Sequence, residues 1–168
     1  MYHFFVEPHQ IGAEEIRIEG ADVNHIRNVL RMKPGEEILI SSREGGDYFC
    51  RVEELEPEYV SAKILEEWEN KELPARIHLF QGLPKGDKME LIIQKAVELG
   101  AFSIIPVETK RCVVKLDVKK AAKKVVRWQQ IAESAAKQSK RMLIPEIHEV
   151  MTYKQALEFA KQLDVKLI

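Results

Sequence analysis

Cysteine is scarce in this sequence, and its two cysteines do not stand where a metal site or a disulfide framework would need them. Cys50 and Cys112 are far apart and belong to no CxxC pair or Cys/His cluster. We therefore expect neither a metal site nor a disulfide scaffold. We interpret both residues as reduced, partly buried thiols.

Long apolar runs are also missing. No stretch approaches the roughly 18 to 20 consecutive apolar residues that a membrane-spanning helix needs, and the N-terminus lacks the basic and apolar regions of a signal peptide. We therefore expect a cytoplasmic protein with no membrane partner. A composition with 45% hydrophobic and 32% charged residues indicates well-packed domains and argues against disorder.

The common nucleotide-binding and catalytic motifs are absent as well. The sequence contains no GxxxxGK[ST] loop, no GxGxxG fingerprint, no Ser-His-Asp arrangement and no HExxH. Residues 85–88 (KGDK) do lie at a predicted helix N-terminus, which favours an anion, although an ordinary turn is the alternative. Glu90, Gln94 and Glu98 share one stripe of that helix, where solvated partners are a better interpretation than a catalytic carboxylate pair.

The net charge of −1 conceals two regions of opposite sign. Residues 1–75 carry 8 Lys and Arg against 17 Asp and Glu, whereas residues 109–144 carry 11 against 2. Such a positive block is typical of a surface that faces a polyanion, and a solvated helix face is the equal alternative. Trp128 is the one aromatic residue of the block, so phosphate-backbone binding is expected there rather than base stacking.

The first region has the pattern of short strands separated by turns, which predicts a small closed barrel. The expected strands cover residues 4–6, 16–18, 37–40, 48–52 and 59–65. Turns are expected at Gly45-Gly46 and at Pro57. One helix, capped by Asp22, interrupts the strands, and the acid-rich residues 66–72 read as a linker. The apolar stripe of this helix is Val23, Ile26, Val29 and Leu30.

The second region alternates strands and helices. A strand over 76–80, a helix from Asp87 to Gly100 with a capping box at Glu90, and a strand over 102–107 predict a βαβ unit with a parallel sheet and a right-handed crossover. A long helix over 117–141 follows, then a third strand over 147–150. The expected apolar face of the long helix is Val118, Ala122, Val125, Ala132, Ala135 and Ala136.

A last helix is expected after Thr152, which forms a second capping box with Gln155. Its expected apolar face is Tyr153, Ala156, Leu157 and Ala160. Residues 165–168 then read as the start of an apolar strand. Because domains rarely finish there, we expect the chain to be an incomplete piece of a longer protein.

Several segments together resemble one known family. Residues 25–31 (HIRNVLR), followed by Gly35, resemble the HxxxVLRxxxG element of the ribosomal RNA small subunit methyltransferase E family, of the SPOUT class. Residues 82–90 (GLPKGDKME) are similar to its central motif. The match continues through Gln94-Lys95, Glu98-Leu99-Gly100, Pro106, Arg111-Cys112, Arg127-Trp128, Ala135, Gln138, Arg141 and Pro145.

The resemblance implies an α/β protein with an N-terminal β-barrel, a PUA-like RNA-binding barrel over 1–70 followed by part of a SPOUT (α/β knot) methyltransferase domain over 75–168. It also implies a homodimer that acts on 16S ribosomal RNA of the small ribosomal subunit. The implied reaction is transfer of a methyl group from S-adenosylmethionine to the N3 of a uridine. The alternative is a binding module in which the chain binds RNA without catalysis.

The sequence departs from the family where the cofactor would bind. The GPEGG and LGxRILRxETA segments do not occur, so the cofactor-binding and catalytic residues stay unassigned, and we expect the 168-residue chain alone to be inactive. Lys85, Lys88, Arg111 and Arg141 are candidates to stabilise a developing uridinate. The predicted RNA-binding residues are His25, Arg27, Arg31, Lys85, Lys88, Arg111, Arg127, Lys137 and Arg141.

Overall fold

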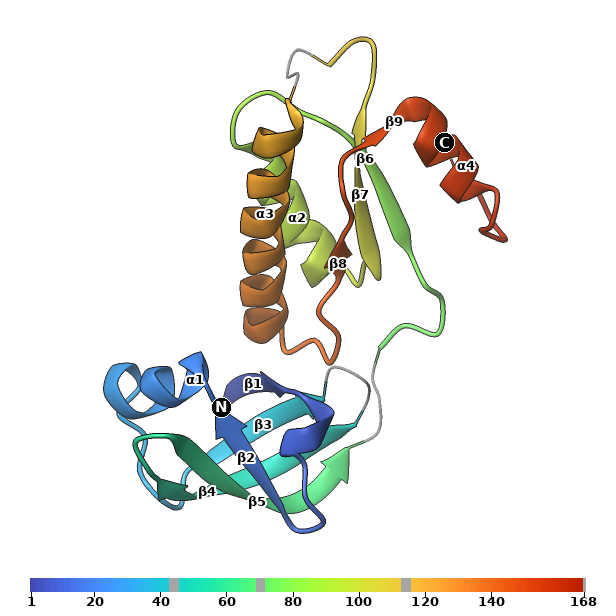
Figure 1. Cartoon of the computed structure of the whole chain (residues 1–168). Helices are drawn as coiled ribbons and strands as arrows, with labels where there is room; N and C mark the ends of the chain where they lie inside the picture. Colours follow the sequence, from blue (N-terminus) through green and yellow to red (C-terminus); the bar gives the residue numbers. More distant parts are fainter. Residues whose placement is uncertain (43–45, 69–71, 113–115, 168) are drawn as a thin grey trace. The chain divides into compact units, whose positions relative to one another are not determined.

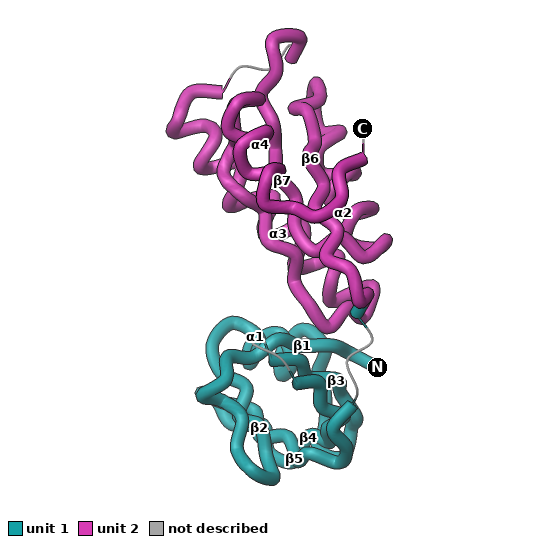
Figure 2. Tube along the Cα trace, turned by 90° about the vertical axis from the view of Figure 1, so that its right-hand side faces the viewer, with its two compact units in different colours: residues 1–72 teal, residues 73–168 magenta. Residues whose placement is uncertain are grey.

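The computed structural model describes residues 1–42, 46–68, 72–112 and 116–167 (Figure 1). The chain divides into two compact units, Met1–Glu72 (unit 1) and Leu73–Ile168 (unit 2), which Figure 2 colours separately. Each unit has its own sheet, so each is described by itself.

Unit 1 is built on one curled sheet of five strands in the order β1-β3-β4-β5-β2 (Figure 2). β1 pairs with β3 in parallel and the other pairs are antiparallel. The described residues form no ladder between the edge strands β1 and β2, so the expected barrel is a curled half-barrel. Its strands are β1 (Tyr2–Val6), β2 (Glu15–Glu19), β3 (Glu37–Ser42), β4 (Asp47–Leu55) and β5 (Tyr59–Trp68).

Alternation of apolar and polar residues gives β2 a core face and a solvent face. In β2 the side chains of Ile16 and Ile18 are buried, whereas Glu15, Arg17 and Glu19 are exposed. One face of β2 therefore turns toward the shared core and the other faces water. β1 and β3 are instead buried on both faces over most of their length. All five expected strands are confirmed. The core is Phe4, Val6, Ile16, Ile18, Val23, Ile26, Met32, Ile38, Ile40, Cys50, Val52, Val60 and Ala62.

Two connections in unit 1 differ from expectation. The linker predicted over 66–72 is wrong at its start, because β5 continues to Trp68. The Trp68 ring stacks on the ring of Phe49 in β4, with 5.7 Å between the ring centroids. Residues 69–71 lie outside the described residues, as does Gly45 of the predicted hairpin turn. Gly46 has a φ of 95°, and its carbonyl accepts a hydrogen bond from Ser42 N at 2.9 Å.

The helical part of unit 1 is short. A 3-10 turn, η1 (Pro8–Gln10), precedes β2; α1 (Ala21–Asn24) follows β2 and continues directly as a π-helical turn, η2 (His25–Val29). The predicted cap at Asp22 is wrong, because α1 already begins at Ala21, after Gly20. The predicted stripe is also wrong at Val29, whose exposed fraction is 61%, because the wider π turn rotates it out of the core.

Unit 2 contains the predicted βαβ unit. β6 (His78–Gly82) and β7 (Ser103–Glu108) pair in parallel, with α2 (Lys88–Glu98) between them. The long helix α3 (Val118–Ser139) follows. The predicted third strand is split into β8 (Glu146–Ile147) and β9 (Met151–Thr152), which both pair with β7, and α4 (Tyr153–Ala160) comes last.

Helices cover both sides of this sheet, with α2 and α3 on one side and α4 on the other (Figure 1). Ile105 and Val107 of β7 pack against Ala156 of α4. On the other side Met89, Ile93 and Val97 of α2 are buried, and so are Trp128, Ala132, Ala135 and Ala136 of α3. The small alanines let the two helix backbones approach closely.

Some predicted core positions of unit 2 are exposed. Val118 at the start of α3 has an exposed fraction of 86%, and Tyr153 and Leu157 of α4 are exposed as well. Phe159 instead anchors α4, with its ring 5.9 Å from the ring of Phe80 and 5.3 Å from that of His148. The strand predicted from Val165 is wrong for the described residues 165–167, which form no strand.

Candidate nucleic-acid interface

The carboxyl ends of β6 and β7 lie at the same edge of the unit 2 sheet, because the two strands are parallel neighbours. Leu83 N, just after β6, donates to Val107 O of β7 at 3.0 Å and joins the two strand ends. In open α/β sheets this edge is where ligands bind. Residues 83–87 before α2 and residues 109–112 after β7 are therefore the natural place for a site, and we call them the carboxyl edge.

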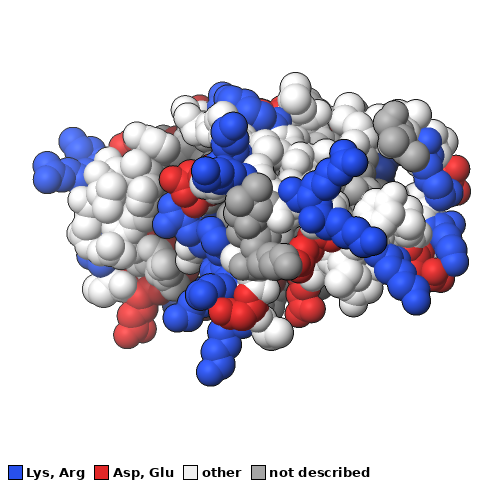
Figure 3. Space-filling view, turned by 90° about the horizontal axis from the view of Figure 1, so that it is seen from above, with Lys and Arg blue, Asp and Glu red and all other residues white. Residues whose placement is uncertain are grey.

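Basic side chains surround the carboxyl edge. Lys85 and Lys88 are exposed at the start of α2, and Lys110 and Arg111 are exposed after β7. Figure 3 looks onto this end of unit 2 and shows Lys and Arg side chains spread over it among fewer acidic ones. The structure thus brings together three residues predicted from the sequence, Lys85, Lys88 and Arg111, and adds Lys110.

A tight turn presents two of these cations. Cys112 N donates to Thr109 O at 3.1 Å, so Lys110 and Arg111 occupy the tip of a four-residue turn. The Cys112 sulfur accepts a hydrogen bond from Thr109 N at 3.4 Å and lies 3.2 Å from Thr109 Oγ1. The Thr109 hydroxyl and backbone N–H, which favour the thiolate, lower the pKa of Cys112.

The two cysteines therefore differ, although both are free thiols as predicted. Cys50 is fully buried in unit 1, and desolvation raises its pKa to about 12. Cys112 is half-buried and belongs to the basic turn. Among the residues that the structure describes, no group of three or more His, Cys, Asp or Glu side chains could hold a metal ion. No helix within the described ranges is long and apolar enough to cross a membrane.

The helix after the turn has Asp87 at its N-cap position, as predicted, but lacks the predicted capping box. The Asp87 side chain makes no capping hydrogen bond, so the expected capping box with Glu90 is wrong. Glu90 instead binds Arg127 of α3 through two hydrogen bonds, from Nε at 2.7 Å and from Nη2 at 2.9 Å. These bonds lower the pKa of Glu90 and raise that of Arg127. The charge of Arg127 is thus balanced within unit 2.

Two further predicted RNA-binding residues have partners inside unit 2. Lys137 Nζ lies 3.3 Å from Glu133 Oε1 on the same helix. Arg141 is buried, with an exposed fraction of 9%, and its Nη1 donates to Val97 O at 3.1 Å and to Ala101 O at 2.6 Å. The structure thus gives the Arg141 guanidinium a structural role at the end of α2, where it is buried.

The remaining predicted residues lie on the helical segment of unit 1. His25 and Arg31 are exposed and Arg27 is half-buried. Beside them lies a pair that the sequence reasoning missed, in which Asn28 Nδ2 donates to Asn24 Oδ1 at 2.7 Å. The four-residue spacing of two amides on a helix was the available signal.

Other predicted polar positions proved to be structural. Gln94 Nε2 and Lys95 Nζ both donate to the Glu98 carboxylate, at 3.0 and 2.7 Å. The interpretation of this stripe as solvated partners is thus confirmed for Gln94 and Glu98, but not for Glu90, which pairs with Arg127. The bonds from Lys95 and Gln94 lower the pKa of the Glu98 carboxyl.

Comparison with known proteins agrees with this architecture. Residues 18–65 match the family model described as "RNA methyltransferase PUA domain", and residues 71–168 match the one described as "RNA methyltransferase domain". The fold is thus a PUA domain followed by an RNA methyltransferase domain. More narrowly, the chain belongs to the ribosomal RNA small subunit methyltransferase E family, as the following similarities show.

The similarities extend over almost the whole chain. The ribosomal RNA small subunit methyltransferase E of Bacillus subtilis is 42% identical over 98% of this chain, and that of Synechocystis is 32% identical over 94%. A crystal structure of the Neisseria gonorrhoeae enzyme bound to S-adenosyl methionine covers 98% of the chain at 35% identity, with a TM-score of 0.81. The chain spans 66%, 50% and 66% of these three relatives' own lengths.

Proposed function

We propose that the whole protein transfers a methyl group from S-adenosylmethionine to the N3 of a uridine in 16S ribosomal RNA. The observation that carries the proposal is the match of both units to RNA methyltransferase models, together with 42% identity to a small subunit rRNA methyltransferase. The SPOUT knot and the homodimer expected from the family belong to the same proposal, as does the division into an RNA-binding domain and a methyltransferase domain.

The carboxyl edge fits the RNA side of this reaction. Uridine N3 carries a proton that must leave as the methyl group arrives, so cationic groups near the base would stabilise the anion that develops. Lys85, Lys88 and Arg111 are exposed and carry such charge, and they also suit the phosphates of the RNA backbone. We propose these three residues for RNA contact and omit the buried Arg141.

The described residues of the carboxyl edge fit the cofactor less well than they fit RNA. The methyl donor is a positively charged sulfonium, and the lysines of the carboxyl edge would repel it. The chain also lacks the GPEGG segment that the family resemblance associates with cofactor binding. We therefore assign no described residue to S-adenosylmethionine and derive no step through it.

Mass mapping of modified small-subunit RNA tests the function. In a strain lacking the gene, one uridine of 16S ribosomal RNA should lose its N3-methyl group, and the gene supplied on a plasmid should restore it. An unchanged modification map would contradict the proposal. The second candidate function, RNA binding without catalysis, rests on the basic carboxyl edge. It predicts RNA affinity without any change in that map.

A further inference from the structure

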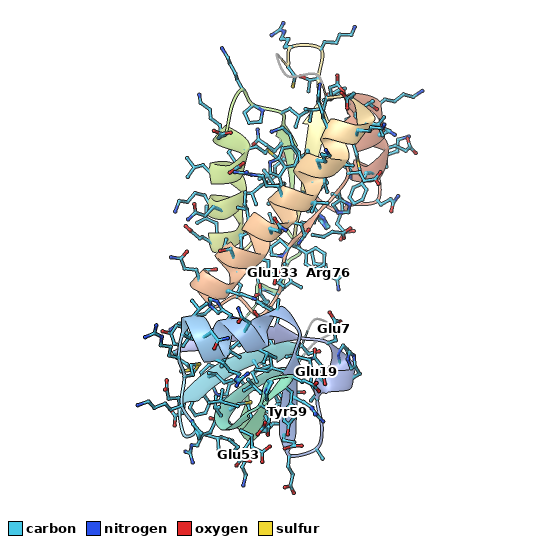
Figure 4. The ribbon with its side chains drawn as sticks, turned by 60° about the vertical axis from the view of Figure 1, so that its left-hand side comes forward. Glu7, Glu19, Glu53, Tyr59, Arg76 and Glu133 are labelled. Atoms are coloured by element: carbon cyan, nitrogen blue, oxygen red, sulfur yellow. The ribbon has the colours of Figure 1, made fainter. Side chains whose placement is uncertain are left out.

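The outer face of the unit 1 sheet carries a group of carboxylates where β4, β5 and β2 lie side by side. Residues 14–19 hold three Glu and one Arg, and residues 53–58 hold four Glu and no basic residue. Glu19 of β2 lies opposite Tyr59 of β5, so the two segments are neighbours in the sheet, as Figure 4 shows. We call this surface the acidic sheet face. Its exposed carboxylates are Glu14, Glu15, Glu19, Glu53, Glu54, Glu56 and Glu58.

An aromatic ring of this face already holds a cation. The Arg17 guanidinium carbon lies 3.7 Å from the centroid of the Tyr59 ring, and Arg17 Nε lies 3.7 Å from Glu19 Oε1. The Tyr59 hydroxyl donates to Glu54 Oε2 at 3.1 Å, which raises the pKa of the hydroxyl, and the charge of Glu56 adds to the rise. Aromatic rings and carboxylates both attract guanidinium and ammonium groups. The chain's own Arg17 therefore shows which kind of group this surface accepts.

The acidic sheet face has more negative charge than its own cations balance. Arg17, Arg51 and Lys63 are the basic residues of β2, β4 and β5, and Arg51 lies 3.8 Å from Glu37 of β3. Arg17 and Lys63 are thus left to balance the seven carboxylates. Like charges this close repel one another and lower the stability of the unit, and a partner of opposite charge would offset that repulsion.

The carboxylates follow the strands and do not gather at one point. No group of three or more His, Cys, Asp or Glu side chains in the described parts of the chain could hold a metal ion. Alternate side chains of a strand point to the same face about 7 Å apart, which is also their spacing in an extended peptide. A segment rich in Lys and Arg can therefore pair with several of these carboxylates in turn, whereas RNA would be repelled.

We propose that the acidic sheet face binds a Lys- and Arg-rich polypeptide segment of another protein, with a partner cation on the Tyr59 ring in place of Arg17 and further partner cations on the surrounding carboxylates. The proposal goes beyond the proposed function, which names only RNA and the methyl donor. Proteins that bind RNA carry such basic segments because they neutralise phosphates. A protein bound to the same RNA therefore has the chemistry that this face fits.

Two triple variants of the full chain, with the same change in net charge, test the proposal. The probe is a fluorescein-labelled peptide of alternating arginine and glycine, and the measurement is fluorescence anisotropy at low salt. Protein-free 16S ribosomal RNA is the second ligand. The test variant combines Glu19→Gln, Glu54→Gln and Glu58→Gln. The control combines three exposed carboxylates of unit 2: Glu146→Gln, Glu149→Gln and Glu158→Gln.

The test variant should bind the peptide about tenfold more weakly, because each exposed pair of a carboxylate and a cation contributes a modest part of the affinity. The control should change the affinity by less than about twofold, since its charges lie away from the contact. The affinity of the test variant for 16S ribosomal RNA should stay the same or rise, because repulsion is removed. Its melting temperature should be equal or higher for the same reason.

The Tyr59 ring gives a second readout. Arg17→Ala vacates the ring, whereas Lys63→Ala removes the same charge from the same face and leaves the ring occupied. Arg17→Ala should therefore tighten peptide binding about threefold more than Lys63→Ala does. Tyr59→Leu combined with Arg17→Ala should cancel this extra gain. Equal gains in Arg17→Ala and Lys63→Ala would contradict the role of the ring.

Equal weakening of peptide binding in the two triple variants would overturn the proposal, because net charge alone would then explain the binding. So would a parent protein that does not bind the peptide at low salt. A loss of affinity for 16S ribosomal RNA in the test variant would make RNA the occupant of this face and would overturn the proposal too. Methylation is measured separately by mass mapping, so a failure of the proposed function would leave these outcomes unchanged.

Discussion

Arg141 shows how burial decides what a basic side chain does. It lies in the most basic stretch of the sequence, yet its guanidinium bonds the carbonyls of Val97 and Ala101 at the end of α2. A buried guanidinium has lost its water, so it is stable only while such acceptors surround it. Its neighbour Lys140, at the surface, ends α3 with a φ of +56°.

Replacing Arg141 should therefore affect stability more than RNA binding. We expect Arg141→Met to lower the free energy of unfolding by about 2–3 kcal/mol, because the Ala101 carbonyl loses its charged donor. Arg127→Met, the matched control on the exposed pair with Glu90, should have a much smaller effect. Urea unfolding of both variants measures the difference, and equal effects would contradict the structural role of Arg141.

Three buried polar side chains of unit 1 form a hydrogen-bonded series that leads to a second prediction. Ser41 Oγ donates a short hydrogen bond to Asp47 Oδ1, and His3 Nε2 lies 2.8 Å from the same hydroxyl. All three residues are buried. Desolvation raises the pKa of the Asp47 carboxyl, Ser41 partly opposes this by its hydrogen bond, and Glu72 adds to the rise.

Asp47 should make unit 1 less stable as the pH rises. Because its pKa is higher in the folded state than in the unfolded state, its stabilising contribution is complete below about pH 4 and is lost as the pH passes through the folded pKa. Asp47→Asn should remove this part of the pH dependence, and Ser41→Ala should extend it to higher pH. Urea unfolding between pH 4 and 7 tests both, and identical pH profiles would refute the assignment.

At the scale of elements, the end of α2 depends on a glycine. Gly100 has a φ of +97°, and a β-carbon added there would lie 2.6 Å from Leu73 Cδ1. The left-handed backbone conformation thus favours glycine at this position. The close contact adds less, because the Leu73 side chain is flexible and 48% exposed. Gly82 at the end of β6 has neither constraint, because a β-carbon added there would meet nothing within 4 Å.

Gly100→Ala should consequently lower the free energy of unfolding by about 1–2 kcal/mol. Gly82→Ala, the matched control, should change it by less than about 0.5 kcal/mol or raise it, since alanine restricts the unfolded chain. Leu73→Ala added to Gly100→Ala should recover part of the loss by removing the clash. Thermal unfolding of the three variants measures these changes. Equal losses in the free energy of unfolding at the two glycines would contradict the role given to Gly100.

Local sequence signals predicted elements well where they acted alone. The capping box of Thr152 and Gln155 is confirmed. The predicted start of the long helix at Asp117 is confirmed too, and the structure adds that the Asp117 side chain caps α3 by accepting a hydrogen bond from Lys120 N at 2.8 Å. At Asp87 the N-cap position is confirmed but the capping box is not, because Glu90 pairs with Arg127 on another helix. The π turn was also missed, because an apolar stripe does not distinguish four-residue from five-residue hydrogen bonds.

At the scale of the whole molecule, the two units carry opposite charge. Residues 1–72 hold 8 Lys and Arg against 17 Asp and Glu, and residues 73–168 hold 18 against 10. RNA affinity should therefore come mainly from unit 2. Such a binding free energy depends strongly on salt, because each phosphate contact releases counterions.

Substitution of the carboxyl edge should reveal this dependence. We expect Lys85→Ala, Lys88→Ala and Arg111→Ala together to reduce the salt slope of 16S ribosomal RNA binding by roughly 2 to 3. Lys154→Ala, an exposed lysine on α4, is the control and should leave the slope unchanged. Anisotropy titrations at several salt concentrations supply the slopes. An unchanged slope in the triple variant would exclude the carboxyl edge from RNA contact.

The sequence by itself determined the strands of unit 1, the βαβ unit, the helix ends at Thr152 and Asp117, and the family, because these follow from local periodicity, caps and ordered motifs. Only the tertiary structure decided which basic residues are available to RNA. Arg141 is buried and Arg127 is paired, while Lys85, Lys88 and Arg111 share one exposed edge. Burial and ion pairing depend on residues distant in the chain, which local patterns do not record.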